Sequence, residues 1–407
     1  MDLPAGLFLV AAAAAVPPLF DAFGRWGRAG AFRPRPVSGR RPRRVLALIP
    51  ARAEGARMLP LCRDLVREAT AAGIRLDLRV ILDGADPAAE AALAAGAVPI
   101  LVKGTAGPSK GKALAFATEV LLGSEPELLT AADFVMVFDA DMRLEEGFFT
   151  TLAVPDGTEA FQLPVRPAGV PPPGPARVEA LSLAVATRVE DLARDAEGLP
   201  VRLRGKAMGF SPRAWRDGPA GAHRTTAEDS EATLRLLGRG VRIRALPAPW
   251  AFDEASGDAA AMAGPRARWL GGHLKLLATG AADLARIAID SPRAAAVLAA
   301  DLWLRPRAVV LAVLLLVAAT ADVTLVVLAL ARRTGAVPAV LLASVLSKAA
   351  LVLEFLAAGA ARDVLGTPPE LPPVTARDLA AYLRMWLRAA VAALRAPGAW
   401  HRARPEA

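Results

Sequence analysis

Residues 134–142 read FVMVFDADM, and this stretch decides how the rest of the chain is interpreted. Its apolar part, Phe134–Phe138, is long enough for one buried strand and ends in Asp139 and Asp141, with a single alanine between them. Because side chains two residues apart on an extended chain point to the same side, the two carboxylates can face one ligand together. Paired carboxylate oxygens suit Mg²⁺ or Mn²⁺ carrying a phosphate. The alternative is a strand that runs into a solvated turn, and the flanking sequence has to decide between them.

Upstream of this stretch, short apolar runs typical of strands alternate with helical patterns. The expected strands are 45–49, 79–82, 98–102 and 134–138, and the expected helices are 58–72, 88–95 and 110–122. Such alternation predicts an α/β fold, with a doubly wound and mostly parallel sheet covered by helices on both faces. Ligands of such sheets bind outside the carboxyl ends of the strands. The residues that directly follow the four expected strands, and so share one edge, are Pro50, Asp83, Lys103 and Asp139.

The composition narrows the class of protein. Of 407 residues, 54% are hydrophobic, which is more than a soluble domain needs and indicates membrane segments. The net charge of +9 would suit nucleic acid, anionic lipid or a phosphorylated substrate. Only 5% of residues are aromatic and Tyr382 is the sole tyrosine, so surfaces for base stacking are scarce and we expect no nucleic acid partner. A single cysteine, Cys62, excludes an intrachain disulfide and fits a reducing compartment.

The N-terminal region combines an apolar segment with a basic one. Residues 3–20 are apolar, with Pro17 and Pro18 near the end. A secretory signal has basic residues before its apolar segment, and none precedes this one. Residues 22–44 contain eight arginines and no acid. Because positive charge marks the cytoplasmic flank of a span, we expect an uncleaved anchor at 1–21 and a cytoplasmic, basic Pro/Arg linker at 22–44.

The C-terminal region contains two further apolar segments. Residues 308–331 and 337–361 are each long enough to cross a bilayer, so two transmembrane helices are expected within 306–361, after an interfacial connector at 281–305. In the tail, 362–407, leucines and arginines form opposite stripes between Thr375 and Leu394. This pattern is typical of an amphipathic helix lying on the membrane, and the alternative is a helix packed on the soluble domain, which we place at 45–280.

Five motifs follow one another along the predicted soluble domain. They are IPARAE at 49–54, Asp83-Gly84, Asp139-Ala140-Asp141, Glu228-Asp229 and Arg268-Trp269. Together they resemble the family 2 glycosyltransferases with the GT-A fold, in particular the membrane-associated group related to cellulose and hyaluronan synthases. The resemblance covers residues 44–277 and extends into the paired C-terminal spans. The family's usual first motif is IPARNE, and Ala53 replaces its asparagine.

The resemblance implies a role for each matching residue on the donor side. Asp83 matches the acid that binds the base or ribose of a nucleotide, and Pro50 and Glu54 match the loop that holds the same nucleotide. Asp139 and Asp141 match the pair that binds Mg²⁺ or Mn²⁺ on the diphosphate. From its own position, Lys112 at the start of an expected helix would favour phosphate through its charge and the helix N-terminus, unless it is merely solvated.

On the acceptor side, the resemblance implies that Asp229 is the catalytic base and that Glu228 beside it binds substrate. An inverting transfer needs one carboxylate to take the proton from the acceptor hydroxyl. Arg268 and Trp269 would hold a diphosphate or stack on a sugar. Processive synthases carry a glutamine three residues before this arginine, where the present chain has Pro265, so we expect a non-processive enzyme.

The sequence therefore predicts an inner-membrane, inverting glycosyltransferase whose catalytic domain is cytoplasmic. It would move a sugar from a nucleotide sugar, with UDP-linked sugars as first candidates, to a lipid or cell-envelope acceptor. A sugar-1-phosphate nucleotidyltransferase would share the layout, but it needs a Gly-rich phosphate loop after the first strand, which 50–55 is not. A third interpretation is a membrane scaffold that keeps the fold without catalysis.

Overall fold

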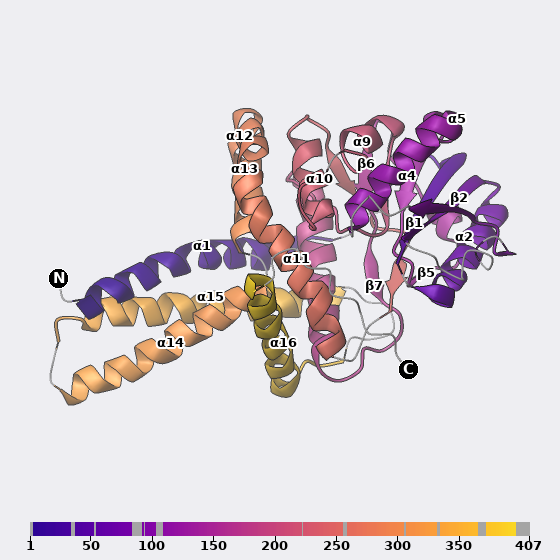
Figure 1. Cartoon of the computed structure of the whole chain (residues 1–407). Coiled ribbons are helices and arrows are strands. Elements are labelled where there is room, and N and C mark those ends of the chain that lie inside the picture. The colour runs from indigo at the N-terminus through magenta and orange to yellow at the C-terminus, as the bar shows by residue number, and fades with distance from the viewer. Residues whose placement is uncertain are drawn as a thin grey trace.

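The computed structural model describes residues 3–33, 37–52, 54–83, 92, 94–102, 109–221, 223–254, 259–304, 307–331, 334–364 and 372–395. An α/β domain lies at one side of the molecule, and three long helices extend away from it on the other (Figure 1). A further group of helices lies between these two parts. Five of the eight residues of the expected helix at 88–95 fall outside the described residues.

The main sheet has seven strands within the described chain, in the order β3-β2-β1-β4-β8-β6-β9. Strands β1 (Arg44–Ala51), β2 (Arg75–Asp83), β3 (Val98–Val102) and β4 (Phe134–Val137) are parallel, as the sequence predicts. Strand β8 (Met208–Phe210) runs antiparallel to both β4 and β6 (Ala160–Gln162), and β9 (Ile243–Ala245) is parallel to β6. The sheet is therefore mixed, because β8 returns to the sheet between β4 and β6 in the opposite direction.

The residues of β1 show why this strand is an almost unbroken apolar run. Val45, Ala47 and Ile49 point into one core layer, which lies under α2 (Leu59–Ala72) and α6 (Phe148–Thr151). Leu46 and Leu48 point into the opposite layer, under α4 (Lys110–Ser124), α9 (Pro212–Asp217) and α10 (Glu228–Leu237). A strand of a parallel sheet that is covered on both faces must be apolar on both.

A small second sheet lies next to the aspartate pair. Its strands are β5 (Met142–Leu144), β10 (Ala251–Asp253) and β7 (Val165–Pro167), in the order β5-β10-β7. The register of β10 places Asp253 opposite Met142, the residue that follows Asp141. Residues about 110 positions apart in the chain are thereby brought to one place.

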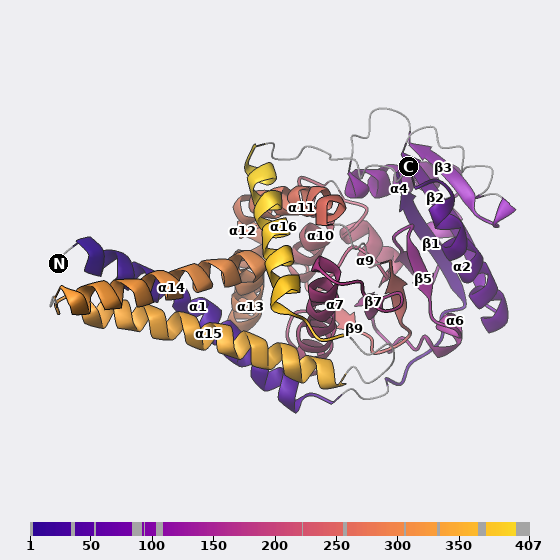
Figure 2. The ribbon, with the colours of Figure 1, turned by 90° about the horizontal axis from the view of Figure 1, so that it is seen from below.

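Of the described helices, three are long and apolar enough to cross a membrane: α1 (Leu3–Ala31), α14 (Arg307–Leu330) and α15 (Val337–Val364). Figures 1 and 2 show α1 alongside α15. The expected end of the anchor at residue 21 is not the end of its helix, which continues through both prolines to Ala31. Packing explains the difference, because Arg25 pairs with Glu354 of α15 and Ala29 is buried. The first basic residues of the expected linker are therefore part of the helix.

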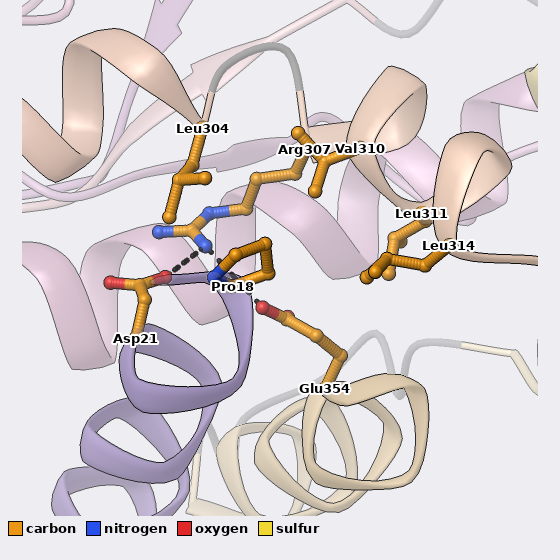
Figure 3. Close-up of a pocket in the computed structure, with 8 residues that line it drawn as sticks. All are labelled: Pro18, Asp21, Leu304, Arg307, Val310, Leu311, Leu314 and Glu354. Carbon is orange, nitrogen blue, oxygen red and sulfur yellow. Dashed lines mark hydrogen bonds and ion pairs between the residues drawn. The ribbon is translucent and has the colours of Figure 1, made fainter. Parts of the chain in front are cut away.

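A layer of ion pairs joins these helices to the α/β domain. In Figure 3, Arg307 at the start of α14 points toward Asp21 of α1 and Glu354 of α15, with which it forms ion pairs. The guanidinium of Arg307 also lies 3.1 Å from Glu190. Glu190 belongs to η2 (Ala186–Leu192), a π-helical turn between α7 (Pro175–Val185) and α8 (Ala193–Ala196). We call this set, together with Arg25, the junction layer.

The remaining helices lie across the direction of the three long ones (Figures 1 and 2). They are α11 (Ala259–Thr279), α12 (Ala281–Asp290), α13 (Pro292–Trp303) and α16 (Ala376–Arg395). One side of α16 packs on α11, with Met385, Trp386 and Ala389 buried in the contact. Its other side exposes Leu387 and Leu394 among arginines. The tail helix therefore packs on its neighbours with one face and keeps an amphipathic outer face.

Candidate active site

The carboxyl ends of the central parallel strands form one edge of the main sheet. Pro50 and Asp83 lie at the ends of β1 and β2, where Pro50 is level with Ile81, and Asp139 comes two residues after β4. The predicted common edge is therefore present in the backbone. The side chain of Asp83 lies outside the described part of the structure, as do Ala53, Gly84 and Lys103.

Two lysines that the sequence analysis did not single out lie against the carboxylates of this edge. The ammonium group of Lys110, the first residue of α4, contacts Asp139 and donates a hydrogen bond to the carbonyl oxygen of Gly205 at 2.6 Å. Lys206, on the loop before β8, forms an ion pair with Asp253 at the end of β10. The ammonium groups of these two lysines therefore already lie among the carboxylates of Asp139, Asp141 and Asp253.

The two aspartates of the pair differ in the direction in which their surroundings shift the pKa. Burial raises the pKa of Asp139, but the ammonium groups of Lys110 and Lys206 outweigh it, so that the pKa lies below its usual value. Burial, and then the carboxylates of Asp139 and Asp253, raise the pKa of Asp141 to about 7. Near neutral pH the pair therefore carries between one and two negative charges.

The residues after β4 and at the end of β10 have the chemistry of a divalent-cation site but not its spacing. Asp139, Asp141 and Asp253 offer hard carboxylate oxygens, and lysine cations lie against two of them, as a positive ion would. Among the described residues, no three histidine, cysteine, aspartate or glutamate side chains are arranged closely enough to hold a metal ion. A bound ion would therefore need the carboxylates to come closer together and the two lysines to turn away from them, for example to phosphate oxygens.

The second acidic pair begins α10. Glu231 holds the loop before the helix, because its carboxylate accepts hydrogen bonds from the backbone N–H groups of Arg224 and Thr225 at 3.0 to 3.1 Å. This leaves Glu228 and Asp229 at the N-terminus of the helix, where negative charge is stabilised. Asp229 is 9% exposed.

Glycines let the two acidic pairs come together. Gly205 has φ +81°, and a Cβ at this position would lie 3.8 Å from Oδ2 of Asp229 and 3.9 Å from Oε1 of Glu228. The carbonyl oxygen of the same glycine accepts the hydrogen bond from Lys110. On α4, a Cβ at Gly111 would come within 2.8 Å of Glu228. Gly205 thus connects the aspartate pair after β4 with the acidic pair of α10.

The environment of Glu228 perturbs its protonation. Burial, and then the adjacent Asp229, raise the pKa of Glu228 to about 7, against the opposing charges of Lys110 and Arg268. A carboxyl group with such a pKa can donate a hydrogen bond near neutral pH as well as accept one.

Arg268 and Trp269 point in different directions, because adjacent residues on a helix lie about 100° apart. The charge of Arg268 interacts with Glu228 and Asp139, which places this guanidinium at the carboxylate site. The ring of Trp269 stacks on His273, with centroids 4.8 Å apart, and meets Trp386 of α16 edge-on. The structure therefore brings Arg268 to the site and uses Trp269 to pack α11 against the tail helix.

Lys112 lies on the exposed side of α4. Its backbone N–H is capped by Ser109, and its side chain is exposed on the outer surface of α4. Lys110, two residues earlier, makes the contact with Asp139. The two lysines face different ways because a shift of two residues turns the side chain by about 200°, and a phosphate contact by Lys112 stays a prediction.

Of the other expected residues, Glu54 lies within electrostatic range of Asp141. The KGK run could have indicated Lys110 from the sequence. No local pattern indicates Lys206 or Asp253, because their positions at the site depend on how β8 and β10 pair in the two sheets.

A mixed sheet of this strand order, with a small second sheet beside an aspartate pair, is a fold that the chain shares with solved nucleotide-sugar glycosyltransferases. The chain is similar to the mannosyltransferase PcManGT from Pyrobaculum calidifontis, solved with GDP-mannose and Mn²⁺, with a TM-score of 0.53 and 16% identity over 96% of this chain and 99% of that one. A more distant structure is glucosyl-3-phosphoglycerate synthase from Mycobacterium tuberculosis in complex with phosphoglyceric acid, with a TM-score of 0.40 and 16% identity over 60% and 80% of the two chains. No protein-family model and no curated protein matches the sequence. At 16% sequence identity, this similarity establishes the fold alone.

Proposed function

We propose that this protein is a membrane-bound, inverting and non-processive glycosyltransferase. It takes a sugar from a nucleotide sugar and transfers it to a lipid or cell-envelope acceptor at the cytoplasmic face. UDP-linked sugars are the first donors to test, and GDP-linked sugars come next because the similar mannosyltransferase was solved with GDP-mannose.

The observation that carries this proposal is the meeting of two acidic pairs around Gly205. Asp139 contacts Lys110, Lys110 donates to Gly205, and Gly205 lies beside Asp229 and Glu228. A donor diphosphate on the first pair and an acceptor hydroxyl on the second would therefore be neighbours. Transfer of a sugar between two bound groups requires this proximity.

On the donor side, the chain offers a site for a diphosphate. Pro50 lies at the end of β1, Glu54 follows that strand, and Asp83 ends β2; these positions would hold the nucleotide at the edge where ligands of such sheets bind. A divalent ion held by Asp139 and Asp141 would neutralise the charge that develops on the leaving nucleoside diphosphate. Lys110, Lys206 and Arg268 would add charge-assisted hydrogen bonds to its phosphate oxygens.

On the acceptor side, Asp229 would accept the proton of the attacking hydroxyl. A single base suffices for inversion, since the hydroxyl attacks the anomeric carbon from the face opposite the nucleotide. Glu228, with its pKa raised to about 7, would donate a hydrogen bond to the acceptor or accept one from it.

The membrane location rests on the three long apolar helices and on charge. The arginines that follow α1 support a cytoplasmic location for its C-terminal end. The other end of α1, its N-terminus, would then lie outside, and the α/β domain and the junction layer would lie inside. The acceptor would arrive from the bilayer, which favours a lipid-linked molecule.

The test is sugar transfer by the full chain in lipid nanodiscs with Mn²⁺ or Mg²⁺ and a panel of UDP- and GDP-sugars, with products identified by mass. We expect transfer by the unmodified protein and its loss, by at least about 100-fold, in Asp229→Asn, since general acid–base catalysis contributes at least that factor. Asp139→Ala should also abolish transfer, and it should weaken Mn²⁺-dependent donor binding as well.

The matched control is Asp156→Asn, which removes a carboxylate that is 90% exposed and pairs with the solvated Arg40. This variant should retain full activity. Transfer that survives in a folded Asp229→Asn protein would remove the assignment of the base. An unmodified protein that neither transfers a sugar nor is stabilised thermally by any nucleotide sugar with Mn²⁺ would favour the scaffold interpretation.

A further inference from the structure

A polar cluster interrupts the apolar surface of α14 and α15. Asp322 of α14 accepts hydrogen bonds from Lys348 and Ser344 of α15, each at 2.7 Å and both on the same oxygen, Oδ1. The side chain of Asp322 is 47% exposed and that of Lys348 is 52% exposed. The ion pair is thus only half covered by the chain itself.

The position of the cluster along the helices places it at the depth of the bilayer interior. Along the backbone of α14, Asp322 is about four turns, roughly 22 Å, from Arg307 of the junction layer. Along α15, the backbone of Lys348 is roughly 9 Å from Glu354 of the same layer, and its long side chain spans the difference to reach Asp322. The hydrocarbon core of a bilayer is about 30 Å thick. If the junction layer marks the cytoplasmic boundary, both charges lie within the hydrocarbon region.

Exposed charge at that depth is unfavourable. A charged side chain near the centre of a membrane helix costs about 2.5–3.5 kcal/mol on insertion scales, and such residues almost always face protein or water. The surface around the pair is apolar and faces outward; it includes Val323, Val326 and Val345, which are 53% to 64% exposed. A protein surface that covers the pair would remove this cost.

The charges of the pair indicate what covers it. One acid and one base lie side by side on the same surface, so this surface is complementary to itself under a two-fold axis. A two-fold contact would bring the partner's Lys348 beside Asp322, and each carboxylate would gain a second cation. The flanking valines would pack across the axis, and van der Waals packing and interhelical hydrogen bonds drive such association in lipid.

We propose that two copies of this chain associate in the membrane through the faces of α14 and α15 that carry Asp322 and Lys348. The proposal rests on the membrane location given under the proposed function and not on the sugar chemistry. Its test therefore needs neither donor nor acceptor.

The test is cysteine cross-linking of the full chain in native membranes and in nanodiscs. Cys62 is the only cysteine and is buried, so Cys62→Ser provides a background free of thiols. Val326→Cys lies one turn from Asp322 on the same side of α14, whereas Val313→Cys lies on the opposite side and is similarly exposed, at 53% against 60%. We expect oxidation to give a product of twice the chain mass for Val326→Cys, at least five-fold more than for the Val313→Cys control.

Charge reversal tests the role of the pair. Asp322→Lys in the Val326→Cys background should reduce cross-linking, and adding Lys348→Asp should restore it, because the double variant re-creates both the internal and the intermolecular pairs. Because the double variant also repairs the internal pair, thermal unfolding of each variant is measured in parallel: loss of cross-linking in an Asp322→Lys protein that keeps its unfolding temperature shows a contact between chains, and loss that only accompanies unfolding contradicts it. Mass photometry of nanodiscs should give two chains for the unmodified protein and one for Asp322→Lys.

Three outcomes would overturn the proposal. They are equal cross-linking at Val326→Cys and Val313→Cys, adducts only with a protein of another mass, and a single chain per nanodisc for the unmodified protein. If the protein transfers sugar but remains monomeric, this inference alone fails. If it dimerises without transferring sugar, the proposed function fails and this inference stands.

Discussion

At the scale of single residues, the site is decided by which side chains face the sheet edge. Asp139 and Asp141 share one side of an extended segment, so their cooperation follows from local geometry. The identity of the lysine that contacts Asp139 does not follow from local geometry. Lys110 and Lys112 belong to the same KGK run, and only the packing of α4 turns Lys110 toward the aspartate. The same holds for Arg268 and Trp269, which diverge on α11.

Lys110→Met should weaken use of the donor by about 100-fold in kcat/KM, because a charge-assisted contact to phosphate is worth about 2–3 kcal/mol. Lys112→Met, on the exposed side of the same helix, should change it less than about two-fold. Steady-state kinetics at saturating acceptor measure both. Equal losses in the two variants would show that α4 contributes general positive charge and not a specific contact.

Binding of Mn²⁺ should depend on pH through Asp141. Because burial and Asp139 raise the pKa of Asp141 to about 7, the group is protonated below that pH and must lose its proton to bind a metal. Affinity should therefore be constant above about pH 8 and fall by up to about ten-fold per unit below pH 7. Calorimetric titrations at pH 6 and pH 8 in buffers of different ionisation enthalpy measure both affinity and proton release, and equal affinities without proton release would contradict the assignment.

At the scale of elements, tertiary packing changes where a helix ends and in which direction a strand runs, relative to what local sequence patterns predict. Helix α1 continues past its two prolines because Arg25 and Ala29 are held against the rest of the chain. Strand β8 enters the sheet antiparallel, which brings Gly205 and Lys206 beside the aspartate pair. The π-helical turn η2 places Glu190 against Arg307, so a local irregularity serves the contact between the two parts of the molecule.

The buried ion pair between Arg194 of α8 and Asp301 of α13 should be one of the costliest contacts to break. Both side chains are 1% exposed, and two hydrogen bonds of 2.6 and 3.1 Å join them. Removing one partner leaves an uncompensated buried charge, so Asp301→Ala should lower the free energy of unfolding by about 3–5 kcal/mol. Replacing both, as Arg194→Met with Asp301→Leu, should cost clearly less.

Thermal unfolding of the protein in nanodiscs measures this difference. The matched control is Arg213→Ala, whose side chain is 67% exposed and pairs with Glu159, and whose loss should cost less than about 1 kcal/mol. If the double variant is as unstable as Asp301→Ala, the loss would come from packing and not from the unpaired arginine.

At the scale of the whole molecule, the α/β domain is fixed to the three long helices by the junction layer, and α12, α13 and α16 lie across them (Figures 1 and 2). This arrangement would hold the active site at a set height above a bilayer surface. The exposed leucines and arginines of α16 are suited to that surface, with apolar side chains in the interface and basic ones at anionic headgroups.

The orientation of the chain can be tested with single cysteines in the Cys62→Ser background. Gly335→Cys lies between α14 and α15, at the end remote from the α/β domain, and an impermeant maleimide should label it in intact spheroplasts. Asp156→Cys on the α/β domain should be labelled only after the membrane is permeabilised. The reverse pattern would place the catalytic domain outside.

The sequence by itself determined the α/β class, the shared edge of β1, β2 and β4, the aspartate pair and the long apolar helices. Each of these depends on local periodicity or on which residue follows a strand, and both are written along the chain. Only the tertiary structure decided that β8 runs antiparallel, that Asp253 and Lys206 lie with the aspartate pair, that Lys110 and not Lys112 contacts Asp139, and that Asp322 and Lys348 meet between two helices. These facts depend on contacts between segments far apart in the chain, whose geometry is set by packing and not by local pattern.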